Sequence, residues 1–202
     1  MKVYQNRFSP NAKRTRVVLE ECGIAYDVVS LDPMKGEQGT PAYLAKNPMG
    51  KVPTLEEEDG FVLWESPATL VYFAEKHPEK KLLPQSARER AEAMRWMFWN
   101  ASHLESALFA IAFEKMFKPM MGGTPDAARI ASEEKNVARF APVLEARLAD
   151  REWVAGTYGI ADIALGTTIE FAVATGFDVA GFPNVQRWLA RVQARDAWKR
   201  AG

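Results

Sequence analysis

The chain has 202 residues, of which 48% are hydrophobic and 11% aromatic, so it can bury a sizeable core. This composition excludes a disordered or fibrous protein. The 26 basic and 26 acidic residues cancel, whereas nucleic-acid binders and membrane-surface proteins usually carry a basic excess. One cysteine, Cys22, excludes an internal disulfide, and the two histidines, His77 and His103, are too few for a multi-histidine metal site.

No apolar segment approaches the ~18 residues that a membrane-spanning helix needs. The amino-terminal residues also lack the apolar stretch of a signal peptide. We therefore expect a soluble protein of a reducing compartment, the cytoplasm.

The first 77 residues alternate between strand-like and helix-like patterns. Residues 2–5 and 26–31 are rich in strand formers, and between them Ser9-Pro10 is typical of a helix start and Gly23 of a helix end. A strand, a helix and a strand at this spacing predict a βαβ unit with two parallel strands.

A short helix is expected at residues 41–46, before a second pair of strands. The strand-like runs 52–57 and 61–64 are joined by Asp59-Gly60, a strong hairpin signal, and Ser66-Pro67 then opens another helix. The pattern predicts a βαβ-α-ββ-α domain, a small sheet of about four strands with helices packed on it.

From residue 85 onward the pattern predicts helices only. They are expected at 88–118, from Thr124 to Leu148, at 159–175, at 185–191 and at 194–201, with Pro142 kinking or dividing the second. The charged stretch 77–84 is bracketed by prolines, as is typical of a linker. We therefore predict two domains, an α/β domain at residues 1–78 and an all-helical domain at residues 86–202.

Three places in the first domain could carry chemistry, and each has a plain structural explanation. Ser9 is a normal helix cap, yet a hydroxyl at a helix N-terminus also favours an anion. Val52-Pro53 either starts an edge strand or forms a cis bond that exposes the Val52 backbone to an extended ligand. Glu65-Ser66 is a helix start that could instead hold a zwitterion, with Glu65 on its ammonium and Ser66 on its carboxylate.

Taken together, these residues resemble the cytosolic glutathione transferases, over essentially the whole chain. The resemblance rests on Ser9-Pro10-Asn11, on Asn47-Pro48-Met49-Gly50-Lys51-Val52-Pro53, on Glu65-Ser66 and on Ala161-Asp162-Ile163, which occur in the family's order and spacing. Ser9 lies 14 residues before Gly23, as in the serine-type theta-like and phi-like classes. The resemblance implies a thioredoxin-like first domain, a helical second domain and a homodimer.

The resemblance also implies roles for single residues at the sulfur and cysteinyl parts of glutathione. Ser9 corresponds to the hydroxyl that binds the glutathione sulfur, and Asn11 is a second candidate for touching it. Val52 corresponds to the residue that pairs its backbone with the cysteinyl unit, before a cis Pro53.

The same resemblance assigns the two ends of glutathione. Glu65 and Ser66 correspond to the γ-glutamyl site, while Lys51 and Gln38 lie where family members contact glutathione, often at its glycyl end. Gln38 stands where many relatives have His, which lessens the positive field there. Gly159 stands where the family usually has a Ser or Thr helix cap, a substitution that costs only a few tenths of a kcal/mol.

The electrophile site of the family lies between the domains, which makes Arg95, Trp99, His103 and Phe117 its candidate walls. Residues 96–99, Trp-Met-Phe-Trp, cover more than one helix face, so packing in the core or at interfaces is the plainer role for most of them.

We expect a glutathione transferase that adds the thiolate of glutathione to a small hydrophobic electrophile, with glutathione as co-substrate and no metal or redox cofactor. The alternative within enzymes is a glutathione-dependent peroxidase or disulfide reductase, although Cys22 is expected to be a packed core thiol and no nucleophile. From other classes, the chain could be a non-catalytic glutathione-fold binding module, or a structural protein stabilised by its dimer.

Overall fold

A four-stranded sheet forms the centre of the first of two units in the computed structural model, which describes all 202 residues. Its strands, in the order β2-β1-β3-β4, are β1 (Lys2–Gln5), β2 (Asp27–Ser30), β3 (Thr54–Glu56) and β4 (Val62–Trp64). Strand β1 pairs parallel with β2 and antiparallel with β3, and β3 and β4 form a hairpin. The predicted βαβ unit and hairpin are confirmed.

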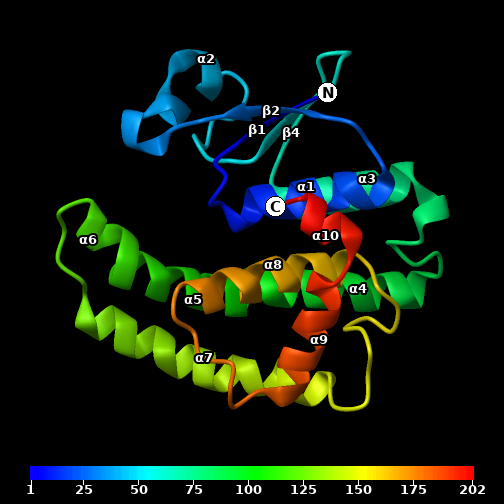
Figure 1. Cartoon of the computed structure of the whole chain (residues 1–202), viewed down its shortest axis with the longest axis vertical. Coiled ribbons are helices and arrows are strands. Elements are labelled where there is room, and N and C mark those ends of the chain that lie inside the picture. Colours follow the sequence, from blue (N-terminus) through cyan, green and yellow to red (C-terminus); the bar gives the residue numbers. More distant parts are fainter. The chain divides into compact units, whose positions relative to one another are not determined.

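Helix α1 (Pro10–Cys22) lies beside α3 (Ser66–Lys76) on one side of the sheet, while the short α2 (Pro41–Leu44) lies on the other (Figure 1). Two 3₁₀ turns, Pro33–Lys35 and Glu37–Gly39, precede α2. Gly23 ends α1 with a φ of 73°, which glycine adopts without steric cost. This is the thioredoxin-like arrangement that the sequence predicted.

The last residues of the chain belong to this first unit, which comprises Met1–Leu83 and Arg195–Gly202. Helix α10 (Asp196–Arg200) packs on α1, where Arg16 Nε donates to the Ala201 carbonyl over 2.9 Å. The sequence boundary instead placed residues 195–202 in the helical domain, since a short helical pattern gives no sign of its distant partner. The distant partner of α10 is α1, and oppositely charged side chains join the two helices.

Two ion pairs hold α10 on α1. Arg195 contacts the Glu21 carboxylate at 2.6 and 2.9 Å, and Arg200 Nε lies 2.7 Å from Glu20 Oε2. The bidentate geometry of the Arg195 pair is the kind that contributes to stability even near the surface.

The predicted linker contains a 3₁₀ turn, Pro78–Lys80, and ends on two buried leucines, Leu82 and Leu83, which are 3% and 2% exposed. The second unit, Pro84–Ala194, follows. It contains no strand, as the sequence predicted.

The helices of the second unit begin with a long helical stretch from 87 to 120 (Figure 1). Two π-helical segments interrupt this stretch where the sequence predicted one regular helix. The elements are α4 (Ala87–Trp99), the π-helical Asn100–Leu104, α5 (Glu105–Ala112), the π-helical Phe113–Phe117, α6 (Lys118–Met120), α7 (Ala127–Arg147), α8 (Ile160–Ala174) and α9 (Pro183–Gln193).

Pro142 does not divide α7, which runs unbroken from 127 to 147. Proline leaves the carbonyl four residues earlier without its helical partner. That residue, Ala138, is exposed, as is Pro142, so water can satisfy the carbonyl. The proline is tolerated because it lies on the solvent side.

The start of α8 is organised by the fully buried carboxylate of Asp162. It accepts hydrogen bonds from the Gly159 and Val154 backbone N–H groups at 3.1 and 3.0 Å and from Trp188 Nε1 at 2.8 Å. Gly159 has no side chain to cap the helix, so Asp162 ties the helix start to the preceding loop and to α9.

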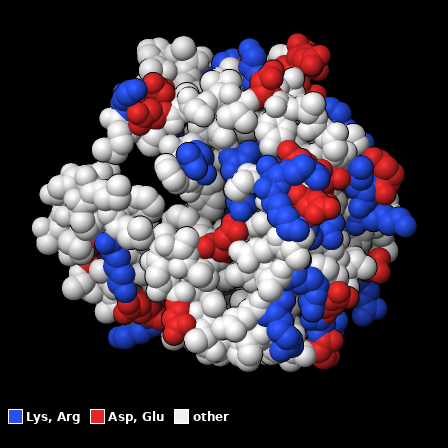
Figure 2. All heavy atoms as spheres, in the orientation of Figure 1, with Lys and Arg blue, Asp and Glu red and all other residues white.

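Basic and acidic side chains are interspersed on the face drawn in Figure 2. None of the helices combines the length and apolar character needed to cross a membrane.

Burial raises the pKa of Asp162 from 3.8 to about 6, since lost solvation outweighs its hydrogen bonds. Between pH ~4 and ~6 the folded state holds a proton on Asp162 that the unfolded state does not. The stabilisation of the folded state by this proton is therefore complete below pH ~4 and is lost as the pH rises through ~6. Two pKa units correspond to about 3 kcal/mol. We expect the free energy of unfolding of wild type minus that of Asp162→Asn to be larger by about this amount at pH 4 than at pH 7.

Urea titrations at pH 4, 5, 6 and 7 measure this difference. Asp150→Asn, at an exposed carboxylate, is the control and should show no such trend. A difference between wild type and Asp162→Asn that stays constant with pH would contradict the raised pKa.

Candidate active site

Ser9 ends the loop after β1 and caps α1. Its Oγ accepts a hydrogen bond from the Ala12 backbone N–H over 3.2 Å, and Pro10 occupies the first helical position. The structural role predicted for Ser9 is therefore confirmed. Because the oxygen accepts in this contact, the hydroxyl proton remains able to donate to a group at the helix N-terminus.

Ser66 begins α3 directly after a strained residue. Glu65 has a φ of 71° and a ψ of 102°, in the region that side chains rarely adopt. Such a conformation costs roughly 1–3 kcal/mol and is concentrated at binding and catalytic sites. The turn leaves the Glu65 side chain exposed while Ser66 is only 3% exposed.

The start of α1 is hydrogen-bonded to the start of α3 through Ser66. The Ser66 hydroxyl donates to Asn11 Oδ1 over 3.3 Å and accepts from Arg14 Nη1 over 3.1 Å. One turn further along, Thr15 Oγ1 lies 2.9 Å from Thr69 Oγ1. Asn11 and Ser66, which the resemblance assigned to different parts of glutathione, are thus in direct contact.

Arg14 was missed by the sequence analysis, which assigned it no role. It is 1% exposed. A signal was present, because Arg14 lies one helical turn before Val18 and therefore on the apolar side of the helix.

The loop before β3 contains the Val52-Pro53 peptide bond, which is cis, as the second of the two interpretations predicted. The preceding Lys51 carbonyl accepts from the Tyr43 hydroxyl at 2.6 Å and from Asn47 Nδ2 at 2.7 Å. The N–H and C=O of Val52 have no partner within the chain. They are free to pair with an extended ligand.

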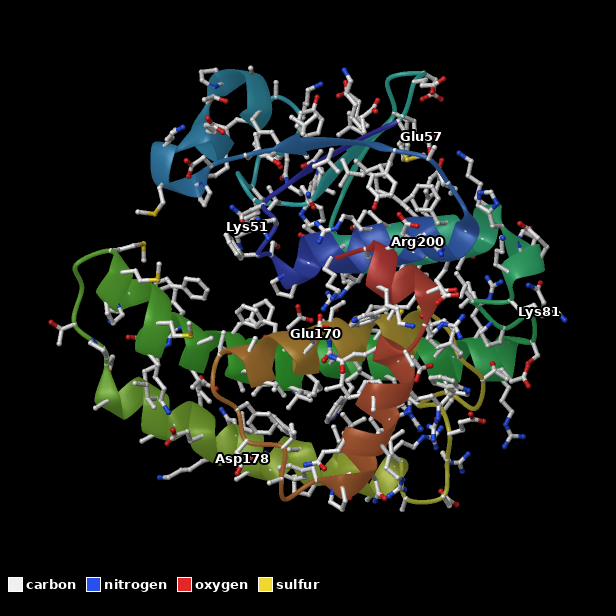
Figure 3. All side chains as sticks on the ribbon, viewed as in Figure 1. Lys51, Glu57, Lys81, Glu170, Asp178 and Arg200 are labelled. Atoms are coloured by element: carbon white, nitrogen blue, oxygen red, sulfur yellow. The ribbon has the colours of Figure 1, made fainter.

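A cavity of about 270 Å³ lies beside this loop, within the first unit. Gly50, at a φ of 59°, lines it where an added Cβ would come within 3.2 Å of the Gln38 carbonyl. Gln38 Oε1 is buried there without a hydrogen-bond partner, and Lys51, labelled in Figure 3, is exposed at the rim. The lining residues are Asn6, Leu31, Pro33, Gln38, Gly50, Lys51 and Val52.

The four candidate walls of the electrophile site lie in the second unit and do not form one group. The rings of Trp99 and His103 both contact Phe140, with centroids 6.5 and 5.2 Å apart. Arg95 pairs with Glu92 at 2.6 Å. At the far end of the long helical stretch, the ring of Phe117 stacks on that of Phe171 at 6.3 Å.

A second cavity, of about 320 Å³, lies within this unit among α5, α7 and the loop that contains Asp178, labelled in Figure 3. None of the four candidate residues lines it. In the run 96–99, Trp96 and Met97 are buried, as expected for most of it, while Phe98 is 68% exposed.

Burial raises the pKa of the Cys22 thiol to about 11, so the group stays protonated near neutral pH. Its sulfur packs near the Phe73 carbonyl, as expected for a core thiol. No three His, Cys, Asp or Glu side chains are grouped as metal ligands.

Two sequence families match the chain. The family described as "Glutathione S-transferase, N-terminal domain" matches residues 8–76, and "Glutathione S-transferase, C-terminal domain" matches residues 104–196. The chain belongs to the glutathione S-transferase family. This membership identifies it as an enzyme, as the sequence predicted.

Curated relatives match along nearly the whole chain. Glutathione S-transferase F10 of Arabidopsis thaliana is 33% identical, over 94% of this chain and 90% of its own. Glutathione S-transferase GstB of Escherichia coli is 32% identical, over 94% and 91%.

Solved structures agree with this assignment. A glutathione S-transferase of Pseudomonas fluorescens has a TM-score of 0.86 at 32% identity, covering 97% of this chain and 96% of its own. A glutathione transferase of Burkholderia graminis, with two glutathione molecules bound per subunit, has a TM-score of 0.87 at 31% identity, covering 99% and 86%.

We expect Asn47→Ala to destabilise the loop before β3. Asn47 is 2% exposed, and its amide donates to the Lys51 carbonyl while its Oδ1 accepts from the Met49 N–H at 3.0 Å. Leaving these groups unpaired should lower the free energy of unfolding by about 1–3 kcal/mol, measured in urea. Asn136→Ala, which removes a contact with Glu133 near the surface, is the control, and equal losses in the two variants would contradict this role.

Proposed function

We propose that the protein activates the thiol of glutathione as a thiolate and transfers it to a small hydrophobic electrophile. The observation that carries the proposal is the hydrogen-bonded contact between Asn11 and Ser66, which joins the helix start at Ser9 to the helix start after Glu65. Glutathione is a tripeptide, so the site for its sulfur and the site for its γ-glutamyl unit must lie close enough for one short peptide to reach both. The bound glutathione in the Burkholderia relative supports the same ligand.

Glutathione binds along the first unit in an extended form. Glu65 takes the γ-glutamyl ammonium and Ser66 its carboxylate, at the N-terminus of α3, where backbone N–H groups favour an anion. The unpaired N–H and C=O of Val52 bond the cysteinyl unit as a strand would. The glycyl end enters the 270 Å³ cavity, where Lys51 supplies a positive charge and Gln38 an amide.

Ser9 is the residue that acts on the sulfur. A thiol with a pKa near 8.5 is only a few per cent ionised at neutral pH. A hydrogen bond from the Ser9 hydroxyl, together with the N-terminus of α1, stabilises the thiolate. Lowering the pKa by two units requires roughly 2.7 kcal/mol, which these two contributions can supply. The thiolate then attacks the electrophilic carbon and forms a C–S bond, while the thiol proton leaves to solvent. The bond that breaks gives its electron pair to the leaving halide of an aryl halide, or to the oxygen of an opened epoxide, which takes a proton from solvent. Asn11 is the second residue within reach of the sulfur.

Arg95, Trp99, His103 and Phe117 remain candidate contacts for the electrophile. No other cofactor takes part in the proposed step. We also propose a homodimer that acts in the cytoplasm.

A binding and activity screen tests the proposal. Glutathione should raise the melting temperature, because a ligand that binds only the folded state stabilises it, and Glu65→Ala or Ser66→Ala should remove most of the shift. A panel of aryl halides, epoxides, isothiocyanates, hydroperoxides and mixed disulfides then identifies the reaction. Activity confined to hydroperoxides or disulfides would favour the peroxidase or reductase alternative, and no thermal shift would contradict glutathione binding.

The role of Ser9 predicts a specific loss of turnover. Ser9→Ala should lower the transfer rate by about ten- to a hundredfold, as expected for a lost charge-assisted hydrogen bond. Glutathione affinity should change much less, and the thiolate absorbance of the bound ligand should titrate at higher pH. The lost cap should also lower stability by about 1 kcal/mol.

Ser86→Ala is the matched control, because Ser86 caps α4 through the Glu89 N–H in the same way. It should lose similar stability and keep normal turnover. Unchanged turnover and an unmoved pH profile in Ser9→Ala would contradict its catalytic role.

The proposed homodimer predicts a solution mass of twice 22.6 kDa. The exposed apolar Phe98 is suited to an interface. Light scattering at micromolar concentration should give the doubled mass, and Phe98→Asp tests whether this residue contributes. A wild-type protein of monomer mass would refute the dimer.

A further inference from the structure

We infer that Arg14 is a positioning residue that fixes the direction of the Ser66 hydroxyl, and that Asn11 holds the Ser66 proton until a ligand carboxylate accepts it. The inference rests on the proposed function, since the ligand carboxylate is that of the γ-glutamyl unit. The geometry comes from the two contacts of Ser66 Oγ, at 3.1 Å from Arg14 Nη1 and 3.3 Å from Asn11 Oδ1.

The direction of the Ser66 O–H group follows from the fact that a hydroxyl has one proton to donate and two acceptor positions. Arginine can only donate, so Arg14 must occupy an acceptor position of Ser66. The Ser66 proton then has to point elsewhere, and in the free protein it points to Asn11. A ligand carboxylate beside Ser66 accepts the same proton, because it is a stronger acceptor than a neutral amide.

Burial makes Arg14 effective in this role. It is 1% exposed, so water does not compete for its N–H groups, and the interior strengthens its field. A hydroxyl that accepts from a cation also becomes a better donor, since hydrogen bonds in a chain polarise one another. Arg14 thus favours an anion next to Ser66 without touching it.

The same exchange changes Asn11. When the γ-glutamyl carboxylate takes the Ser66 proton, the Asn11 amide loses its partner, two residues after Ser9 in the first turn of α1. The released side chain can turn toward the sulfur of the same ligand. Occupation of the γ-glutamyl site is thereby coupled to the availability of Asn11 at the sulfur.

Two ligands that differ in one group distinguish the positioning role of Arg14 from a general effect of its substitution on the fold. Glutathione is compared with 4-aminobutyryl-cysteinyl-glycine, which lacks only the α-carboxylate of the glutamyl unit. Dissociation constants are measured by calorimetry for the wild type, Arg14→Met, Arg14→Lys, Ser66→Ala and Arg14→Met/Ser66→Ala. Arg16→Met is the matched control, because Arg16 is also a buried arginine of α1 but donates to the Ala201 carbonyl.

We expect Arg14→Met to weaken glutathione binding about tenfold and the shortened peptide less than twofold. In the Ser66→Ala background the further loss of Arg14 should have less than a twofold effect, since Arg14 acts through that hydroxyl. Arg16→Met should change the affinity for both ligands by the same factor. If Arg14→Met does not fold, Arg14→Lys decides, because it keeps the charge but not the fixed N–H, and it should weaken glutathione alone about threefold.

Equal losses for both ligands, or additive losses in the double variant, would overturn the inference while leaving the proposed function intact. Wild-type protein that binds neither ligand would instead refute the proposed function. Asn11→Ala gives an independent readout: glutathione affinity should not fall, since a competing acceptor is removed, while turnover at saturating glutathione should fall several-fold. A weakened affinity in that variant would overturn the role given to Asn11.

Discussion

The hydrogen bonds at Ser66 are the constraint on which the first unit's site depends. Ser66 is the first residue of α3, and its hydroxyl contacts two side chains of α1, Asn11 and Arg14. Because Ser66 is almost fully buried, a shift of α1 along α3 would break these hydrogen bonds where water does not replace them. The pairing therefore fixes the distance between the two helix starts.

Backbone groups that lack partners within the chain stand beside the side chains of the proposed glutathione site. Helix N-termini at Ser9 and Ser66 offer N–H groups, and Val52 offers both an N–H and a C=O. Side chains hold this backbone in position, as Tyr43 and Asn47 do at the Lys51 carbonyl. An extended peptide is suited to such a surface, because each of its own polar groups meets a fixed partner.

The sequence predicted those parts of the fold that short-range chemistry determines. Ser9-Pro10 and Gly23 mark the ends of α1 correctly, and Asp59-Gly60 marks the hairpin. The Ser9 and Glu65-Ser66 positions were found because each combines a helix-start signal with a hydroxyl or a carboxylate. Val52 was found because a proline follows it. Their roles toward glutathione are proposals carried by the family resemblance.

Long-range partners were beyond the reach of the sequence. The position of Arg14 on the apolar side of its helix is visible in the sequence, but its partner is not. Only the fold shows that Arg14 contacts the Ser66 hydroxyl and that the buried Arg16 contacts the Ala201 carbonyl. The unbroken α7 around Pro142 likewise depends on which side of the helix faces solvent. Local propensity contains no information of that kind.

The packing of α10 on α1 also sets an order of events during synthesis. Arg16 and its acceptor, the Ala201 carbonyl, are separated by 185 residues, and Glu20 and Glu21 meet arginines that are almost as distant. On the ribosome, the βαβ-α-ββ-α segment emerges first, but one side of α1 stays uncovered until the whole helical unit has been made. Domains usually fold in the order of their synthesis. Here the first unit to emerge is the last to be completed, because its final helix is made only after the whole helical unit.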